Sequence, residues 1–116
     1  MDIDVRIEDN TDKIKELARE QMLVALEKVG LQAERDVKTK MARYSPKPIV
    51  DTGRLMNSIT HETDTDEMVE IVGTNVEYAP YVEYGTSKTK AKPFLKNTIQ
   101  DNMSQYMAIV EDSMKE

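Results

Sequence analysis

Apolar and charged residues alternate at the start of the chain. Ile3, Val5 and Ile7 are each separated by one charged residue, which is the period of two that a half-buried strand shows. This alternation predicts a strand over residues 2–8.

A longer period begins near Thr11 or Asp12, either of which is a good N-cap. The apolar residues then recur about every 3.6 positions, as on one face of a helix; they are Ile14, Ala18, Met22, Ala25, Val29, Ala33, Val37 and Met41. This stripe predicts one helix over about 12–43. Gly30 is its expected bend, because glycine costs a helix up to about 1 kcal/mol.

The length of this helix points towards assembly. At 1.5 Å per residue, about 30 residues span roughly 45 Å, whereas a compact domain of 116 residues has a diameter of roughly 35 Å. The helix is therefore expected to overhang its own domain and to bury part of its stripe elsewhere, most simply on a neighbouring subunit.

Pro46 and Pro48 end the helix, because each proline disfavours the α conformation in the residue before it. A turn motif follows, made of Asp51, Thr52, Gly53, Arg54 and Leu55. Its first three residues can form an Asx-type turn or cap one helical turn through Leu55, and the sequence leaves both open.

The middle of the chain predicts a hairpin. Residues 56–63 and 68–74 have the composition of strands on either side of the acidic tip 64–67. Residues 78–85 predict a single helical turn, with Pro80 near its first position and Gly85 as a left-handed stop.

Pro93 is expected to open the last helix, over about 93–112. The stripe of this helix consists of Leu95, Ile99, Met103, Met107 (or Tyr106), Val110 and Met114. These patterns predict an α+β fold in one domain over 1–116, in which a long N-terminal helix and a C-terminal helix pack on one face of a small antiparallel sheet.

The composition indicates a core with few apolar residues. Apolar residues and glycine make up 44 of 116 residues, below the roughly 45 to 50% of an ordinary domain. Without cysteine there is no disulfide framework and no cysteine-ligated zinc. A partner is therefore expected to supply part of the stability.

The net charge limits the kinds of partner that the protein is expected to bind. A net charge of −6 argues against a dedicated binder of nucleic acid or anionic membranes. No apolar run reaches the roughly 18 residues of a membrane span, and residues 1–8 lack the core of a signal peptide. We expect synthesis in the cytoplasm.

Candidate catalytic groups are weak. Ser58 and His61 are three residues apart, so on a strand they point to opposite faces. His61 is therefore interpreted as an ordinary surface residue, and the acidic tip 64–67 as solvated, since it lacks the remaining features of a calcium loop. No phosphate loop or metal-ligand cluster is apparent, so we expect no enzymatic activity and no cofactor.

Candidate contact residues are aromatic, basic and sulfur-containing. Tyr78, Tyr81 and Tyr84 occur at steps of three, which suits an interface, a base-stacking platform or packing over the sheet. Lys88, Lys90 and Lys92 resemble a phosphate-tracking segment or form a solvated loop. Most helical methionines fall on the stripes, so core packing is favoured over a promiscuous binding surface.

Several motifs together carry a resemblance to a known family. They are Val50 to Ile59 (V-D-T-G-R-L-M-N-S-I), Val72-Gly73-Thr74, Tyr78 to Thr86 (Y-A-P-Y-V-E-Y-G-T) and Pro93-Phe94-Leu95-Lys96. In this order they resemble the tail-completion and head-tail joining proteins of long-tailed, non-contractile phages and prophages. Lys96 stands where that family commonly has arginine, which weakens any bidentate contact there.

The resemblance implies a non-enzymatic structural component of the virion tail or neck. It implies a ring of copies around the DNA channel, contacts with tail-tube, tail-terminator or head-connector proteins, non-specific contact with DNA, and no membrane. The interface candidates are Tyr78, Tyr81, Glu83, Tyr84, Gly85, Thr86, Lys88, Lys90, Lys92, Pro93 and Phe94. The alternative is a small monomeric adaptor or inhibitor that binds a host protein through its Tyr and Met surface.

Two pairings follow as hypotheses. Arg54 and Glu83 are expected to meet, because a partly buried carboxylate needs a partner and the guanidinium can bind it through two hydrogen bonds; exposure of Glu83, or backbone amides as its partners, is the alternative. The acidic residues of 62–77 are expected to face Lys88, Lys90 or Lys92 of a neighbouring subunit, or to line the channel.

Overall fold

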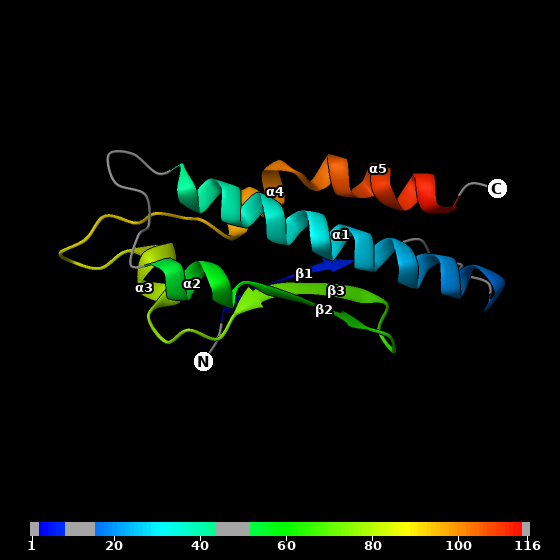
Figure 1. The fold of residues 1–116 in the computed structure, drawn as a ribbon, viewed down its shortest axis with the longest axis horizontal. Helices are drawn as coiled ribbons and strands as arrows, with labels where there is room; N and C mark the ends of the chain where they lie inside the picture. Colours follow the sequence, from blue (N-terminus) through cyan, green and yellow to red (C-terminus); the bar gives the residue numbers. More distant parts are fainter. Residues whose placement is uncertain (1–2, 9–15, 44–51, 115–116) are drawn as a thin grey trace.

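The computed structural model describes residues 3–8, 16–43 and 52–114. The elements in chain order are β1 (Ile3–Glu8), α1 (Glu16–Ala42), α2 (Thr52–Ser58), β2 (Thr60–Asp64), β3 (Val69–Thr74), α3 (Ala79–Tyr84), α4 (Lys96–Asp101) and α5 (Met103–Met114). Figure 1 shows two layers, with α1, α4 and α5 on one side and the sheet on the other. The predicted α+β class, with both long helices on a small antiparallel sheet, is confirmed.

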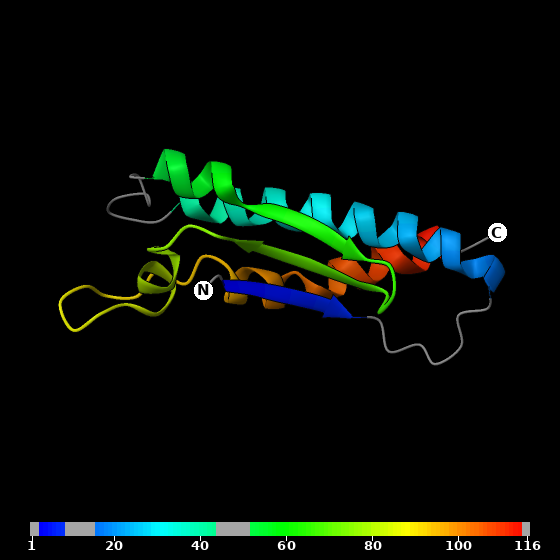
Figure 2. The ribbon, with the colours of Figure 1, turned by 90° about the horizontal axis from the view of Figure 1, so that it is seen from below.

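The sheet has the strand order β1-β3-β2, and both pairings are antiparallel. Val72 in the central strand lies opposite Val5 on one side and His61 on the other. Because strand side chains alternate between faces, this register sets which residues face the helices. None of the described helices covers the opposite face of the sheet (Figure 2).

α1 supplies the largest part of the core. The predicted stripe is confirmed over the described part, since Met22, Ala25, Val29, Ala33, Val37 and Met41 are all buried. The predicted start of the helix, near residue 12, lies outside the described residues, as do Pro46, Pro48 and Asp51. The molecule measures 51 × 25 × 21 Å, so it is elongated along α1, as the helix length predicted (Figure 1).

The predicted first strand of the hairpin begins too early. Residues 56–58 belong to the helix α2, and β2 starts only at Thr60. Leu55 and Ile59 are both buried, and their spacing of four is helical, while the Ser58 hydroxyl donates to the Leu55 carbonyl (2.6 Å). The helical alternative for the turn motif is thus the right one, and it continues past Leu55.

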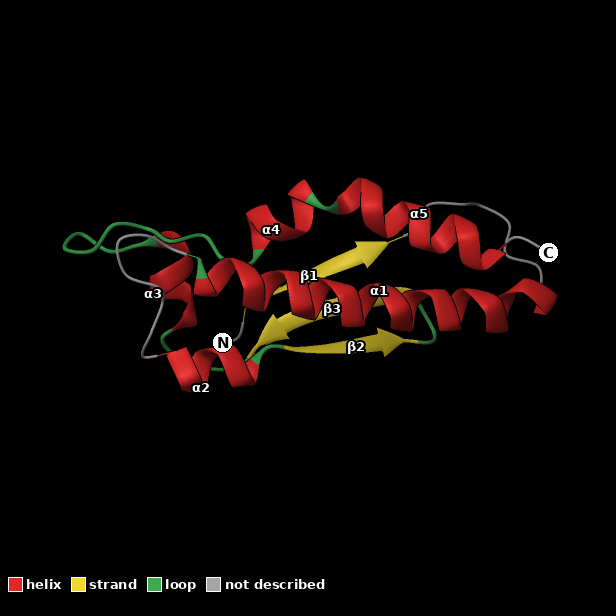
Figure 3. Cartoon of the chain, turned by 45° about the horizontal axis from the view of Figure 1, so that its top comes forward, coloured by secondary structure: helices red, strands yellow, loops and turns green. Residues whose placement is uncertain are grey.

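The predicted helix over 93–112 is also corrected. α4 begins at Lys96, and a break at Asn102 separates it from α5 (Figure 3). Pro93 does not open the helix. Asn102 ends α4 locally, because its side-chain amide donates to the Thr98 carbonyl (2.8 Å) and competes with a continuing helix. Of the two residues named for the stripe, Tyr106 is fully buried and Met107 is half-buried.

Candidate functional site

The predicted helical turn before the lysines is confirmed as α3. Pro80 lies in its first turn, and Gly85 ends it with a φ of +78°, a conformation that residues with a side chain rarely adopt. A Cβ atom at Gly85 would lie 2.7 Å from the backbone nitrogen of Ala91. Gly85 therefore allows the following loop to fold back closely on itself.

Glu83 is buried, with 4% of the residue exposed, and its carboxylate accepts three backbone hydrogen bonds. The donors are the amides of Phe94 (3.0 Å), Leu95 (2.9 Å) and Lys96 (3.0 Å). These amides lie at the start of α4, where helical donors lack intrahelical partners. The backbone alternative for Glu83 is thus the right one, and the predicted pairing of Arg54 with Glu83 is wrong.

Arg54 instead pairs with Glu77. Its two terminal nitrogens donate to the two carboxylate oxygens at 3.0 and 2.8 Å, and its guanidinium lies 5.7 Å from the ring centre of Tyr78. The hydrogen bonds from Arg54 lower the pKa of Glu77 below its ordinary value. Arg54 thus joins α2 to the segment before α3, and not to α3 itself as predicted.

The rest of the turn motif has a mixed placement. Gly53 and Arg54 are exposed, whereas Leu55 is fully buried in the core. Thr52 is the first residue of α2. The motif therefore supplies one core contact and one surface ion pair.

Residues 85–92, which we call the lysine loop, project beyond α3 at one end of the molecule (Figures 1 and 2). The loop is held by backbone bonds from Thr86 to the Thr89 carbonyl (2.8 Å) and from Lys92 to the Val82 carbonyl (2.8 Å). Lys88 and Lys90 are exposed, and Lys92 is half-buried. Within the described chain, none of the three ammonium groups forms an ion pair.

The remaining interface candidates divide between surface and interior. Tyr81 and Tyr84 are 63% and 66% exposed, so these two rings do not pack over the sheet. Phe94 is fully buried and Pro93 is half-buried. The exposed members of the predicted set therefore gather on α3 and the lysine loop.

The acidic residues between 62 and 83 do not form one strip. Glu70 and Glu83 are buried, Glu77 binds Arg54, and Glu67 pairs with Arg6. The Asp64 carboxylate accepts the amides of residues 66 and 67 at 3.0 Å each, which is an Asx-type turn. The exposed acids nearest the hairpin turn lie away from the lysine loop (Figure 2).

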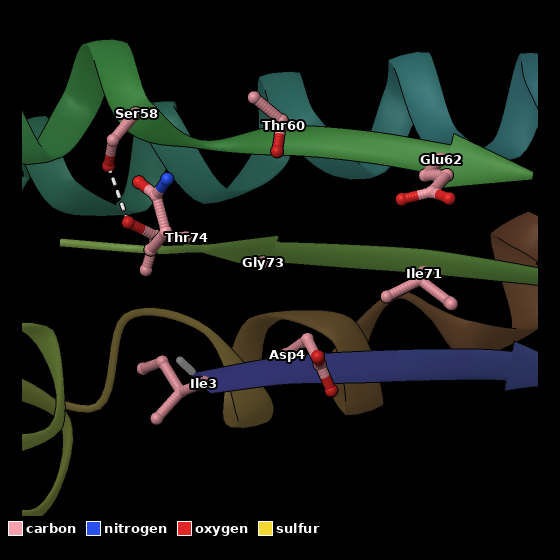
Figure 4. Close-up of a pocket in the computed structure, with 9 residues that line it drawn as sticks. Ile3, Asp4, Ser58, Thr60, Glu62, Ile71, Gly73 and Thr74 are labelled. Carbon is pink, nitrogen blue, oxygen red and sulfur yellow. Dashed lines mark hydrogen bonds between the residues drawn. The ribbon is translucent and has the colours of Figure 1, made fainter. Parts of the chain in front are cut away.

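The open face of the sheet carries a shallow hollow of about 200 Å³ (Figure 4). Ser58 and Thr74 line it, and their hydroxyls are hydrogen-bonded to each other at 2.5 Å. Since the Ser58 hydroxyl also bonds the Leu55 carbonyl and the His61 ring bonds two carboxylates, the two do not form a nucleophile and base pair.

His61 belongs to a polar cluster that sequence analysis missed. Only 14% of its side chain is exposed, so its interpretation as an ordinary surface residue is wrong. Its Nδ1 bonds Oε2 of Glu34 at 2.6 Å, and its Nε2 bonds Oε1 of Glu27 at 3.1 Å. Burial alone would lower the pKa of His61, but these two hydrogen bonds outweigh it and raise the pKa above its usual value.

Glu70 is the buried carboxylate of this cluster, with no exposed surface. Thr63 donates to its Oε1 atom, whereas Oε2 has no hydrogen-bond partner among the described residues. Burial raises the pKa of Glu70, against the effect of the Thr63 hydrogen bond. An unpaired buried polar atom is uncommon in folded proteins and calls for an explanation.

Two features of the sequence could have indicated this cluster. Glu70 has the same strand parity as the buried Val72, so it must face the helices. Gly30 lies between Glu27 and Glu34 on α1, and a Cβ atom there would lie 2.0 Å from Oε2 of Glu70. A glycine in mid-helix, at a cost of up to about 1 kcal/mol, indicates close approach here.

Fold and surfaces together define a small, elongated α+β protein with an anchored basic loop and two exposed tyrosines at one end. The family model described as "Bacteriophage HK97-gp10, putative tail-component" matches residues 6–85. The chain therefore belongs to this family of phage tail components, as the sequence motifs indicated. The match ends at Gly85, the first residue of the lysine loop, and does not reach α4. No curated protein and no solved structure matches the chain, and no described helix is long and apolar enough to cross a membrane.

Proposed function

We propose that this protein is a non-enzymatic part of the virion that completes the tail or joins the head to the tail. In this role several copies form a ring around the DNA channel and contact tail-tube, tail-terminator or head-connector proteins. The observation that carries the proposal is the lysine loop, which a buried carboxylate and backbone bonds hold away from the body of the molecule.

Charge placement supports a head-to-tail contact between neighbouring copies. The basic loop lies at one end of a molecule 51 Å long, and the acidic turn between β2 and β3 lies towards the other end (Figures 1 and 2). Opposite charges on two different patches favour a heterologous contact. Such contacts close into a ring when the rotation between neighbouring copies allows it. In this arrangement Asp66 of one copy approaches Lys88 or Lys90 of the next, unless the lysines face DNA.

The exposed tyrosines provide the apolar part of the same contact. Tyr81 and Tyr84 are spaced three residues apart on α3, and tyrosine is enriched at protein interfaces because its ring is large and its hydroxyl stays hydrated. Met22 and Met41 are buried, so they are not available to the adaptor surface considered above.

The test is assembly on the purified tail tube of the same phage. Light scattering after gel filtration measures the mass of the chain alone and with tubes, and electron microscopy shows whether rings cap the tube ends. We expect capped tubes with a fixed number of copies per end. A chain that stays monomeric and leaves the tubes bare would support the adaptor instead.

A further inference from the structure

The polar cluster between α1 and the sheet has the composition of a metal site. The carboxylates of Glu27, Glu34 and Glu70 surround the single imidazole of His61. One ligand atom from each of Glu27, His61 and Glu70 lies within 4.8 Å of the others. Lys38 pairs with Glu34 at 3.0 Å, which leaves the carboxylates of Glu27 and Glu70 beside the imidazole of His61, and a divalent cation would compensate their negative charge.

Glu70 gives the observation that points to a ligand. It is completely buried, and its Oε2 atom has no partner within the described chain. A carboxylate oxygen in that position is costly unless something binds it. Gly30 keeps the α1 backbone clear of both ligands, since a Cβ atom there would lie 2.0 Å from this oxygen and 2.7 Å from Cδ2 of His61.

His61 is already oriented as a metal ligand. In protein metal sites, the histidine nitrogen that does not bind the metal usually donates to a carboxylate, which fixes the ring. Glu34 fills that role at Nδ1, at 2.6 Å. Nε2 then points to Glu27, at 3.1 Å from its Oε1 atom, close to the roughly 3.3 Å that separates two ligands of a tetrahedral zinc ion.

We propose that Glu27, His61 and Glu70 bind one divalent transition-metal ion, with Glu34 as the positioning residue behind His61. One nitrogen and two carboxylate oxygens suit Zn²⁺. More than half of the Glu27 side chain is exposed, so the ion enters from solvent and water completes its coordination. The ion would hold α1 against β2 and β3 and so stabilise a core that has few apolar residues and no disulfides.

The test is titration of the purified full chain with Zn²⁺ in competition with a chromophoric chelator. We expect one equivalent per chain in the wild type. Glu27→Gln and His61→Gln should weaken binding at least about tenfold, and Glu34→Gln by about tenfold to a hundredfold, the usual effect of losing the carboxylate behind a histidine. Glu62→Gln is the matched control, because Glu62 faces the open side of the sheet and should bind as the wild type does.

Folding is controlled within the same set of variants. Glu27 is exposed, so Glu27→Gln should keep the circular dichroism spectrum of the wild type. Zn²⁺ should raise the melting temperature of the wild type and of Glu62→Gln, but not of Glu27→Gln. Absence of stoichiometric binding, or equal binding by the wild type, Glu27→Gln and His61→Gln, overturns the site. Ring assembly plays no part in these measurements, so the two proposals fail separately.

Discussion

The carboxylate of Glu83 accepts a hydrogen bond of 2.9 Å from the backbone amide of Leu95. The same carboxylate binds the amides on either side of Leu95. One acidic residue near the end of α3 thus provides the hydrogen-bond acceptor for the free backbone amides at the start of α4. Its negative charge lies at the positive end of that helix. This contact determines where the lysine loop leaves the body and where it returns.

Removal of this cap should destabilise the protein. Glu83→Ala leaves the amides of Phe94 and Leu95 buried without acceptors, and we expect a loss of about 2 to 4 kcal/mol in the free energy of unfolding. Glu83→Gln retains one acceptor oxygen and should lose less. Urea unfolding measures both, with the exposed Glu20→Gln as a control expected within about 0.5 kcal/mol of the wild type. Wild-type stability in Glu83→Ala would contradict the cap.

The pair formed by Arg54 and Glu77 should appear in a titration. Hydrogen bonds from Arg54 lower the pKa of Glu77, so Arg54→Gln should raise that pKa towards its ordinary value in a pH series followed by NMR. A lowered pKa in the folded state adds stability above the unfolded pKa, and this stability is lost as the pH falls through the folded pKa.

The stability difference between the wild type and Arg54→Gln should therefore shrink in acid, and also in high salt because the pair is exposed. A double-mutant cycle between Arg54→Ala and Glu83→Ala should give a coupling near zero, since the two side chains have other partners. An unchanged Glu77 pKa in Arg54→Gln would refute the pairing.

Tyr106 anchors α5 to α1 through a polar contact in the core. Its hydroxyl donates to Oδ2 of Asp36 at 2.7 Å, and burial together with this carboxylate raises the pKa of the phenol. Tyr106→Phe removes the hydrogen bond but keeps the ring, so we expect a loss of about 1 to 2 kcal/mol in urea unfolding. Tyr84→Phe, at an exposed ring, is the matched control. Equal stability of the two variants would show that the hydrogen bond contributes nothing.

Charge reversal in the lysine loop should abolish assembly without unfolding the chain. The variant carries Lys88→Glu, Lys90→Glu and Lys92→Glu, and it should keep its circular dichroism spectrum while failing to cap tail tubes. High salt should weaken wild-type assembly in the same assay. The control variant reverses the charge at three exposed positions on α1 or directly after it, namely Lys28, Arg35 and Arg43. Assembly by the loop variant at the wild-type level would exclude a role for the loop.

Periodicity was sufficient to predict the layers of the fold. The stripe from Met22 to Met41 is buried as expected, because a 3.6-residue repeat has one face. Local patterns failed where a distant residue decides the structure. The start of α4 depends on Glu83, at least eleven positions away, so Pro93 gave a misleading signal.

The polar cluster was missed for a related reason. His61 has two glutamate partners on α1, at separations of 27 and 34 residues, and no local spacing motif links them. Strand parity places Glu70 on the helix-facing side, but glutamate is rarely fully buried, so the sequence alone favours a position on the acidic surface. Sequence thus predicted where most of the core lies, whereas three-dimensional contacts decided which acids are buried.

Electron microscopy of particles that lack the protein tests most directly whether it joins or completes the tail. The gene is deleted from the phage or prophage that carries it, the lysate is examined, and the wild-type gene is supplied in trans as the control. We predict DNA-filled heads beside separate tails, or tails with defective ends, and recovery of whole particles on complementation. Normal infectious particles from the deletion strain would contradict the assignment.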